Sequence, residues 1–519
     1  MKLKKITSLL LAGLMLAGSA AIDAVSVSAL EDKSDFEYDV TASGDAVITD
    51  YLGDKSDITI PGSINGHKVT AIGGYSFSYD EHLDKVTIPS SVKSIGSGAF
   101  SCCVGLTTVN IPDSVTSIRL GAFSGCENLY QITLPSKLSS IEDEVFWHTA
   151  LTKIEIPAKV TSIGTSAFAY CGSLESITVP DTVNALGESA FYRCASLSSV
   201  KLSSNLTEIK AYMFSGDTEL TSIAIPSKVK KIKYKAFAES GIKKISISKK
   251  VSSIADEAFS NCFNLKSFTV SKKNNYYSSK KGVLYNKKKT KLLTYPAGKT
   301  AKNLTVPKSV KTIYKKAFYK ASKLGKITFN KGVKTIGMRA FDYCAFKSVK
   351  LPSTVKKIGM NAFKNNLSLK TVSIPKSVTE IKSNAFAMNT ALKTVKFEGN
   401  SKLKLGWGVF EGCKSLRKIS IPKTKSSDGG LCFACNKLKT VKITKDIKKI
   451  YREDFAECRK LNKVTVPKTV KKIGKYALGY INYYDYSYDK NDNFKITGYK
   501  DSAAYKYAKK NGFLFKKLK

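Results

Sequence analysis

One segment of about 23 residues recurs along most of this chain of 519 residues. Ile163 to Val183 reads IGTSAFAYCGSLESITVPDTV, and close copies begin at Ile95 and Ile358. The phenylalanine of the repeat falls at positions 77, 100, 123, 146, 168, 191, 214, 237, 259, 318, 341, 363, 386, 410, 433 and 455, and Leu478 takes its place in a last copy. A fixed period of this length predicts a stack of similar coils instead of one closed core.

Each letter of the repeat has a physical reason. In L-x-x-V-x-I, apolar and polar residues alternate, which is the period of a strand with one buried face. The proline after it cannot donate a ladder hydrogen bond and ends the strand. About six large apolar side chains are buried per repeat, each stabilising by roughly 1.5–3 kcal/mol, whereas ordering each of its residues costs on the order of 1–2 kcal/mol. A single repeat therefore cannot fold alone, and the sequence predicts a mainly β solenoid.

The repeat resembles that of the BspA-like leucine-rich repeat family of bacterial secreted or surface proteins. The opening AVITDYLGDKSDITIPGSINGHKVTAIG and the ending ITGYKDSAAYKYAKKNGFLF are similar to the family's terminal modules. The resemblance implies a leucine-rich-repeat solenoid with a parallel β-sheet on its concave face and short extended or turn segments on the convex side. We expect about 17 coils, one β-hairpin insertion and a short C-terminal helix. The resemblance also implies attachment to host or neighbouring-cell molecules.

The start of the chain has the pattern of a secretory signal. A basic start precedes the apolar run from Ile6 to Ile22, and small residues end at Ala29, the expected cleavage position. An uncleaved membrane anchor is the alternative, but the run is short for that purpose. We therefore expect a secreted, extracellular or cell-surface protein with no transmembrane segment after cleavage.

The expected organisation follows from these patterns. It comprises a signal peptide at 1–29, an N-terminal capping module at 30–70, repeat blocks at 71–270 and 306–480, and a C-terminal capping module at 481–519. Between the blocks, residues 271–305 contain two strand-like runs around Lys287–Thr290. They predict a β-hairpin that either projects from the solenoid or extends its sheet.

Eight of the 11 cysteines occupy one place, three residues after the repeat phenylalanine. They are Cys103, Cys126, Cys171, Cys194, Cys262, Cys344, Cys413 and Cys458. Stacking would bring consecutive members about 4.8 Å apart, but parallel Cβ vectors oppose disulfide geometry. Secretion normally favours disulfides, yet we expect a column of buried free thiols.

No catalytic or metal-binding arrangement stands out. The C-x-x-C of Cys432 and Cys435 has no second pair to complete a zinc site, and we take Phe433 as the repeat phenylalanine and Cys435 as a displaced member of the cysteine column. The three histidines, His67, His82 and His148, lie in different repeats. We expect no enzyme activity, no catalytic residues, no cofactor and no metal.

The net charge of +44 is divided unevenly. Residues 1–240 carry 20 Lys+Arg and 26 Asp+Glu, and residues 241–519 carry 65 and 15. A basic half favours anionic partners, such as wall teichoic acids, acidic glycans, an anionic membrane surface or extracellular nucleic acid. A lysine-rich composition without function is the alternative.

The ligand candidates are the outward positions of L-x-x-V-x-I in the basic half. They include Lys326, Lys350, Lys396, Lys418, Lys442 and Lys463, which stacking would align along the concave sheet. We expect a monomeric, adhesin-like binding protein whose partner is an extracellular protein, anionic glycan or wall polymer, without specific nucleic-acid recognition. The alternative is a wall-associated structural protein that its basic C-terminal half holds electrostatically to anionic polymers.

Overall fold

The computed structural model describes residues 35–399, 402–484 and 487–519. The chain divides into two compact units, residues 1–171 and 172–519. The expected signal peptide, residues 1–29, lies outside the described residues. In the part that the structure describes, no helix has the length and apolar character needed to span a membrane.

Each coil is built from two short strands and a turn. The strand that carries V-x-I, here called the first strand, buries its central residue and exposes the flanking ones, as β8 (Thr108–Asn110) does with Val109 inside. The proline ends it, and a two-residue second strand follows, such as β9 (Ser117–Ile118). A turn then inserts the repeat phenylalanine, and Phe123 is fully buried. The alternation read from the sequence therefore becomes the inside and outside of the coil.

In the first unit, four strands form the N-terminal module: β1 (Phe36–Val40), β2 (Ala46–Tyr51), β4 (Ser63–Ile64) and β5 (His67–Ile72). The first strands are β3 (Asp57–Thr59), β6 (Lys85–Thr87), β8 and β10 (Gln131–Thr133). The second strands are β7 (Ser94–Ile95), β9, β11 (Ser140–Ile141) and β12 (Ser162–Ile163). Strand β2 pairs in parallel with β5, and β5 with β7, so the N-terminal module caps the second-strand sheet.

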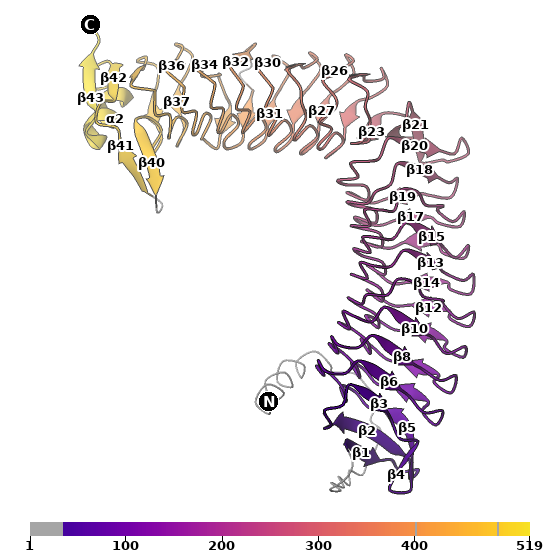
Figure 1. The fold of residues 1–519 in the computed structure, drawn as a ribbon. Coiled ribbons are helices and arrows are strands. Elements are labelled where there is room, and N and C mark those ends of the chain that lie inside the picture. Colours follow the sequence, from indigo (N-terminus) through magenta and orange to yellow (C-terminus); the bar gives the residue numbers. More distant parts are fainter. Residues whose placement is uncertain (1–34, 400–401, 485–486) are drawn as a thin grey trace. The chain divides into compact units, whose positions relative to one another are not determined.

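The second unit repeats this plan (Figure 1). Its first strands are β13 (Ser176–Thr178), β15 (Ser199–Lys201), β18 (Lys244–Ile247), β20 (Ser267–Val270), β24 (Asn303–Thr305), β26 (Lys326–Thr328), β28 (Ser348–Lys350), β30 (Thr371–Ile374), β32 (Thr394–Phe397), β34 (Lys418–Ser420), β36 (Thr440–Lys442) and β38 (Lys463–Thr465). Its second strands are β14 (Ala185–Leu186), β16 (Glu208–Ile209), β17 (Lys231–Ile232), β19 (Ser253–Ile254), β25 (Thr312–Ile313), β27 (Thr335–Ile336), β29 (Lys357–Ile358), β31 (Glu380–Ile381), β33 (Lys404–Leu405), β35 (Ser426–Ser427), β37 (Lys449–Ile450) and β39 (Lys472–Ile473).

The coils stack in parallel with matching residues in register. Val349 pairs with Val372, and Val372 with Val395. The phenylalanine rings stack as well: the centroid of Phe363 lies 5.0 Å from that of Phe341 and 5.1 Å from that of Phe386. Backbone bonds connect the turns, since in most coils the N–H of the repeat phenylalanine donates to the carbonyl of the residue before the next one, as Phe363 does to Ala385. The predicted mainly β leucine-rich-repeat solenoid is confirmed.

The insertion extends the second-strand sheet. Strands β21 (Tyr277–Lys280), β22 (Val283–Asn286) and β23 (Lys291–Thr294) pair antiparallel in sequence order, and β23 then pairs in parallel with β25. The predicted hairpin corresponds to β22 and β23. The preceding strand β21 was not predicted, because YYSSK lacks the apolar alternation that marked the other two.

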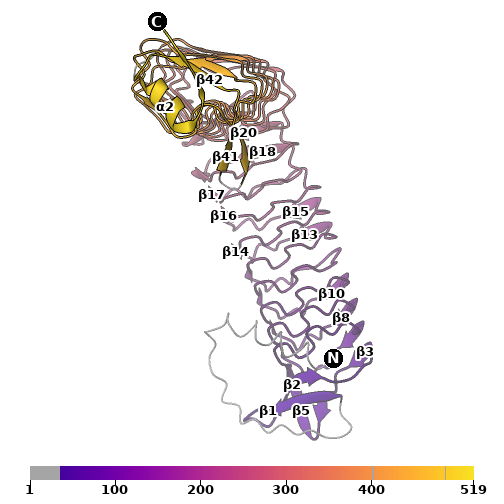
Figure 2. The same cartoon turned by 90° about the vertical axis from the view of Figure 1, so that its left-hand side faces the viewer.

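The C-terminal end of the second unit is closed by a small module (Figure 2). It contains β40 (Tyr480–Tyr484), β41 (Ser487–Lys490), β42 (Lys495–Gly498), helix α2 (Ala503–Asn511) and β43 (Leu514–Lys517). Strand β42 pairs with β38 and with β43, so the first-strand sheet continues into the cap. Ser502 caps the start of the helix and Gly512, in the left-handed region, ends it.

The structure corrects our interpretation of the C-x-x-C segment. The N–H of Phe410 donates to Leu431, so Cys432 takes the place of the repeat phenylalanine. Phe433 is only half-buried and packs 5.5 Å from Trp407. Cys435 is therefore an undisplaced member of the cysteine column. The sequence was misleading because a phenylalanine, Phe433, directly follows the residue that occupies the repeat position, Cys432.

The cysteine column has a hydrogen-bonding role. The Cys344 thiol donates to the carbonyl of Phe318 in the preceding coil over 3.1 Å, and Cys103 donates likewise to Phe77 over 2.9 Å. Where the column has asparagine, the amide does the same, as Asn366 does to Phe341 over 2.8 Å. In these coils the position therefore supplies a small donor to a buried carbonyl. All eleven cysteines are free, and ten of them are buried.

Candidate functional site

The first strands of the second unit expose two positions in each coil, one on either side of the buried central residue. In β28 these positions are Ser348 and Lys350, which flank the buried Val349. Because paired strands keep their register, each position forms a column that runs from coil to coil. Neighbouring members lie about 4.8 Å apart across the sheet.

All six predicted lysines occupy these columns and are exposed. Lys326, Lys418 and Lys463 precede the central residue, and Lys350, Lys396 and Lys442 follow it. Ser373 lies between Lys350 and Lys396 in the ladder, and Lys418 pairs with Thr440. Lysines and hydroxyl groups thus alternate. Lys463 pairs with Lys495, so the column continues into the C-terminal cap. From β26 to β38 the six ammonium groups span roughly 30 Å.

The sequence analysis missed a denser column one residue earlier. The residue directly after the repeat leucine is also exposed, and it is basic in most coils from 302 to 439. Main-chain bonds connect Lys370 to Lys347, Lys393 to Lys370, and Lys439 to Arg417. A count of cations at each position of the repeat would have found this column. The alternation of inward and outward residues in the strand, however, does not predict that this residue is exposed. We define the basic face as both sets: Lys326, Lys350, Lys396, Lys418, Lys442 and Lys463 with Lys302, Lys347, Lys370, Lys393, Arg417 and Lys439.

The charges of the basic face are not neutralised locally. In the described part of the chain, none of its twelve cations forms an ion pair within 4.0 Å, although other surface lysines do. One carboxylate lies beside this face, where Glu398 accepts a hydrogen bond over 2.9 Å from Ser373, the residue between Lys350 and Lys396 in the ladder. Neighbouring cations stand within the Debye length of about 8 Å and repel one another. An anionic polymer along the face would relieve that repulsion.

Earlier coils show that this charge is not required by the fold. The position after the repeat leucine holds Asp84 and Thr107 in the first unit, joined by the same main-chain bond. In the second unit it holds Glu175 and Ser198 before lysine appears at Lys243 and Lys266. The same coil geometry is therefore built with acidic or neutral residues.

The second-strand sheet is basic as well, which offers an internal comparison. Lys311, Lys334 and Lys356 are exposed and stacked, each joined to the next by a main-chain bond of 2.8 Å. This sheet differs from the basic face because one of its lysines is in an ion pair, that of Lys357 with Glu380 over 3.5 Å, whereas the described cations of the basic face form none. The two sheets have similar lysine content but different local neutralisation.

In the described residues, no group of three or more His, Cys, Asp or Glu side chains is placed to hold a metal ion. The thiols of Cys262 and Cys171 are poor nucleophiles, since burial raises the pKa of Cys262 to about 12 and of Cys171 to about 11.

Stacked V-x-I strands, buried leucines and phenylalanines, and an exposed first-strand sheet define a leucine-rich-repeat solenoid. The family model of the BspA type leucine rich repeat region matches residues 55–173, 161–289, 297–404 and 368–485. The chain belongs to this family.

The chain is similar to several solved structures. A leucine rich cell surface protein from Faecalibacterium prausnitzii is 24% identical, with 80% of this chain and 95% of that chain covered and a TM-score of 0.49. A leucine-rich repeat protein from Eubacterium ventriosum is 23% identical, covering 89% and 97%, with a TM-score of 0.42. The pneumococcal vaccine antigen PcpA is 20% identical, covering 95% and 100%, with a TM-score of 0.35. No curated protein matches the chain.

Proposed function

We propose that this protein is a non-enzymatic, adhesin-like binding protein at the cell surface that attaches to anionic extracellular polymers through the basic face. The observation that supports this most directly is the absence of ion pairs at the twelve cations of that face within the described residues. Surface lysines that serve only solubility need no alignment, and here the coil repeat aligns them over successive strands.

An extended polymer suits this face better than a small molecule. The cations are spread along one direction over roughly 30 Å of stacked strands. A polyphosphate or sulfated glycan carries charges at intervals of a few ångströms and can contact many of them at once. The interleaved hydroxyl group of Thr440, which pairs with Lys418, supplies a further donor to its oxygens.

The test uses the full-length protein and two charge-matched variants. Lys350, Lys396 and Lys442 are changed together to Glu in one variant, and Lys311, Lys334 and Lys356 in the other. Both variants change the net charge equally, but only the first alters the basic face. Binding to heparin and to a poly(glycerol phosphate) teichoic acid is measured as a function of salt, with melting temperature as the control for folding.

We expect the first variant to bind at least tenfold more weakly and to lower the salt slope by about 3, one for each lost contact. We expect the second variant to retain most of the affinity. Both should melt near the parent temperature, because all six lysines are exposed. Unchanged binding by the first variant at low salt would overturn the proposal.

The second candidate is the wall-associated protein held only by charge, and the lysines of both sheets favour it. If it is correct, the two variants lose binding equally, and every polyanion binds with the same strong salt dependence. Saturable, salt-resistant binding of one polymer supports the adhesin-like function instead.

A further inference from the structure

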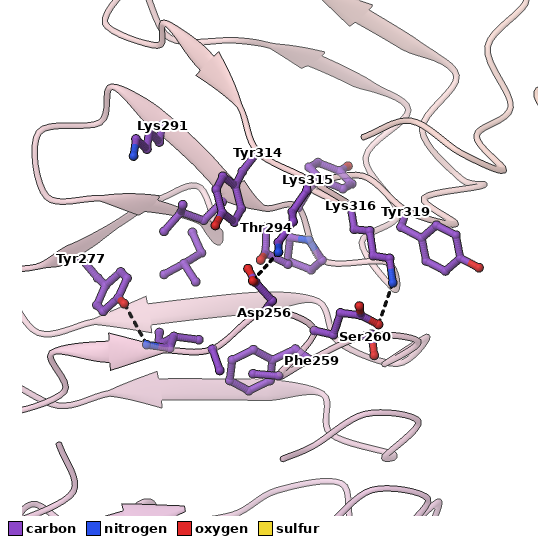
Figure 3. A pocket seen from close by; sticks show the side chains of 18 of the residues that line it. Asp256, Phe259, Ser260, Tyr277, Lys291, Thr294, Tyr314, Lys315, Lys316 and Tyr319 are labelled. Carbon is purple, nitrogen blue, oxygen red and sulfur yellow. Dashed lines mark hydrogen bonds and ion pairs between the residues drawn. The ribbon is translucent and has the colours of Figure 1, made fainter. Parts of the chain in front are cut away.

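The insertion leaves a cavity of about 360 Å³ between two coils of the second unit. One wall is the coil that carries Phe259, and the other is the coil that carries Tyr314 and Tyr319, with the β21–β23 strands alongside (Figure 3). The cavity arises because residues 271–305 do not form a normal coil turn at this level. Its size is in the range of small-ligand sites.

The cavity exposes main-chain groups that are paired in the other coils. In the coil before it, the N–H of Phe237 donates to Ala258 and that of Glu239 to Ser260. The equivalent N–H groups of Phe259 and Asn261 donate to no acceptor in the described structure. Opposite them, the N–H of Tyr295 donates to the carbonyl of Ala317.

On that opposite wall, the coil after the cavity has carbonyls without donors. Lys316 and Lys320 each donate onward, to Met338 and Asp342. The corresponding carbonyls that would accept from the preceding coil, those of Lys315 and Tyr319, accept no hydrogen bond in the described residues. Unpaired main-chain groups of this kind are unfavourable in a recess, and an occupant with both donors and acceptors would satisfy both walls. The buried Oδ1 of Asn261, which also lacks a partner, adds a further acceptor.

The side chains around the cavity combine aromatic rings with two ion pairs and one further lysine, Lys291. Tyr277, Tyr314 and Tyr319 line it, and burial raises the pKa of each phenol, so that all three remain hydroxyl donors at neutral pH. Two ion pairs tie the walls together, Asp256 with Lys315 and Glu257 with Lys316, the latter at 2.6 Å. Because these charges are already paired, an anion gains little here.

From these features we infer that the cavity is a binding site for a short neutral saccharide. A sugar ring offers an apolar C–H face, which packs on aromatic rings, and a rim of hydroxyls, each of which both donates and accepts. That combination matches tyrosines beside unpaired N–H and C=O groups on facing walls. The site is separate from the basic face and is independent of the proposed attachment to anionic polymers.

The experiment measures binding of N,N′-diacetylchitobiose, cellobiose, maltose and a heparin disaccharide by saturation-transfer NMR and calorimetry. We expect one or more neutral disaccharides to bind, with transfer concentrated on the protons of one ring face. Tyr319→Ala should weaken that binding at least tenfold. The matched control is Tyr192→Ala, which removes the tyrosine after the repeat phenylalanine of a coil without the cavity, and it should leave binding unchanged.

A second variant guards against a folding defect. Ser260→Trp fills the cavity from the first wall while all three tyrosines remain, and it should abolish binding with little change in melting temperature. Failure of every neutral disaccharide to bind, binding of the heparin disaccharide alone, or equal effects of the Tyr319 and Tyr192 variants would overturn the inference.

Discussion

Replacing Phe363 by alanine tests the stacking of coils at its most informative point. The ring is fully buried, and its centroid lies 5.0 and 5.1 Å from those of the rings on either side. A phenylalanine deletion in a core costs about 3–5 kcal/mol, and the upper part of that range applies where the cavity cannot collapse.

Collapse is blocked here by the main chain. Phe341 donates to Ala362 and Phe363 donates to Ala385, both over 2.7 Å. These bonds fix the coil spacing, so the neighbouring rings cannot move together to fill the space. We therefore expect a loss of about 4–5 kcal/mol in the free energy of unfolding, with the lost aromatic contacts included.

The matched control is Phe433→Ala. By sequence it occupies the same repeat position, but in the structure it is half-buried and contacts Trp407. We expect a loss of about 1 kcal/mol, which is ordinary for a partly exposed side chain. The pair of variants thus also tests the assignment of Cys432 to the phenylalanine position.

The assay combines urea denaturation with hydrogen exchange followed by mass spectrometry. For Phe363→Ala, exchange should accelerate in the peptides of that coil and of its two neighbours, because repeat proteins lose stability through shared interfaces. A loss below about 1 kcal/mol, or equal losses in the two variants, would refute the reasoning from stacked rings and fixed coil spacing.

Three further predictions concern the buried polar column. Cys344→Ser should be tolerated, whereas Cys344→Val should cost about 1–2 kcal/mol more in urea denaturation because it removes the donor to Phe318; equal losses would contradict this role. Burial raises the pKa of Asp217 well above its usual value. Its stabilising contribution is then present at acidic pH, below the unfolded pKa near 4, and is lost as pH rises toward the folded pKa. Asp217→Asn should therefore raise the melting temperature at pH 7.5 and flatten its pH dependence, as Asn389 already holds the equivalent place and accepts from Asn366; an unchanged pH profile would argue against a protonated carboxyl. In thiol labelling of the native protein, Cys102 should react first, since it is the only cysteine that is not fully buried, and disulfides among the column cysteines in unreduced protein would overturn the free-thiol assignment.

Local sequence determined the coil itself. Alternation in V-x-I, the proline that ends the strand and the buried phenylalanine each act within one repeat, so the fold class and the six exposed lysines could be predicted without tertiary information. The same local logic placed β22 and β23. It failed at Phe433, because Cys432 and Phe433 are both apolar and the sequence pattern does not show which of the two is buried at the repeat position.

Only the tertiary structure decided what happens between coils. The donor role of the cysteine column, the cation column after the repeat leucine and the cavity beside Tyr314 all depend on which residue of one coil faces which residue of the next. That register is set by main-chain hydrogen bonds between residues more than 20 positions apart. Because such bonds do not depend on side-chain identity, the sequence determined the coil, whereas stacking determined which of its side chains meet.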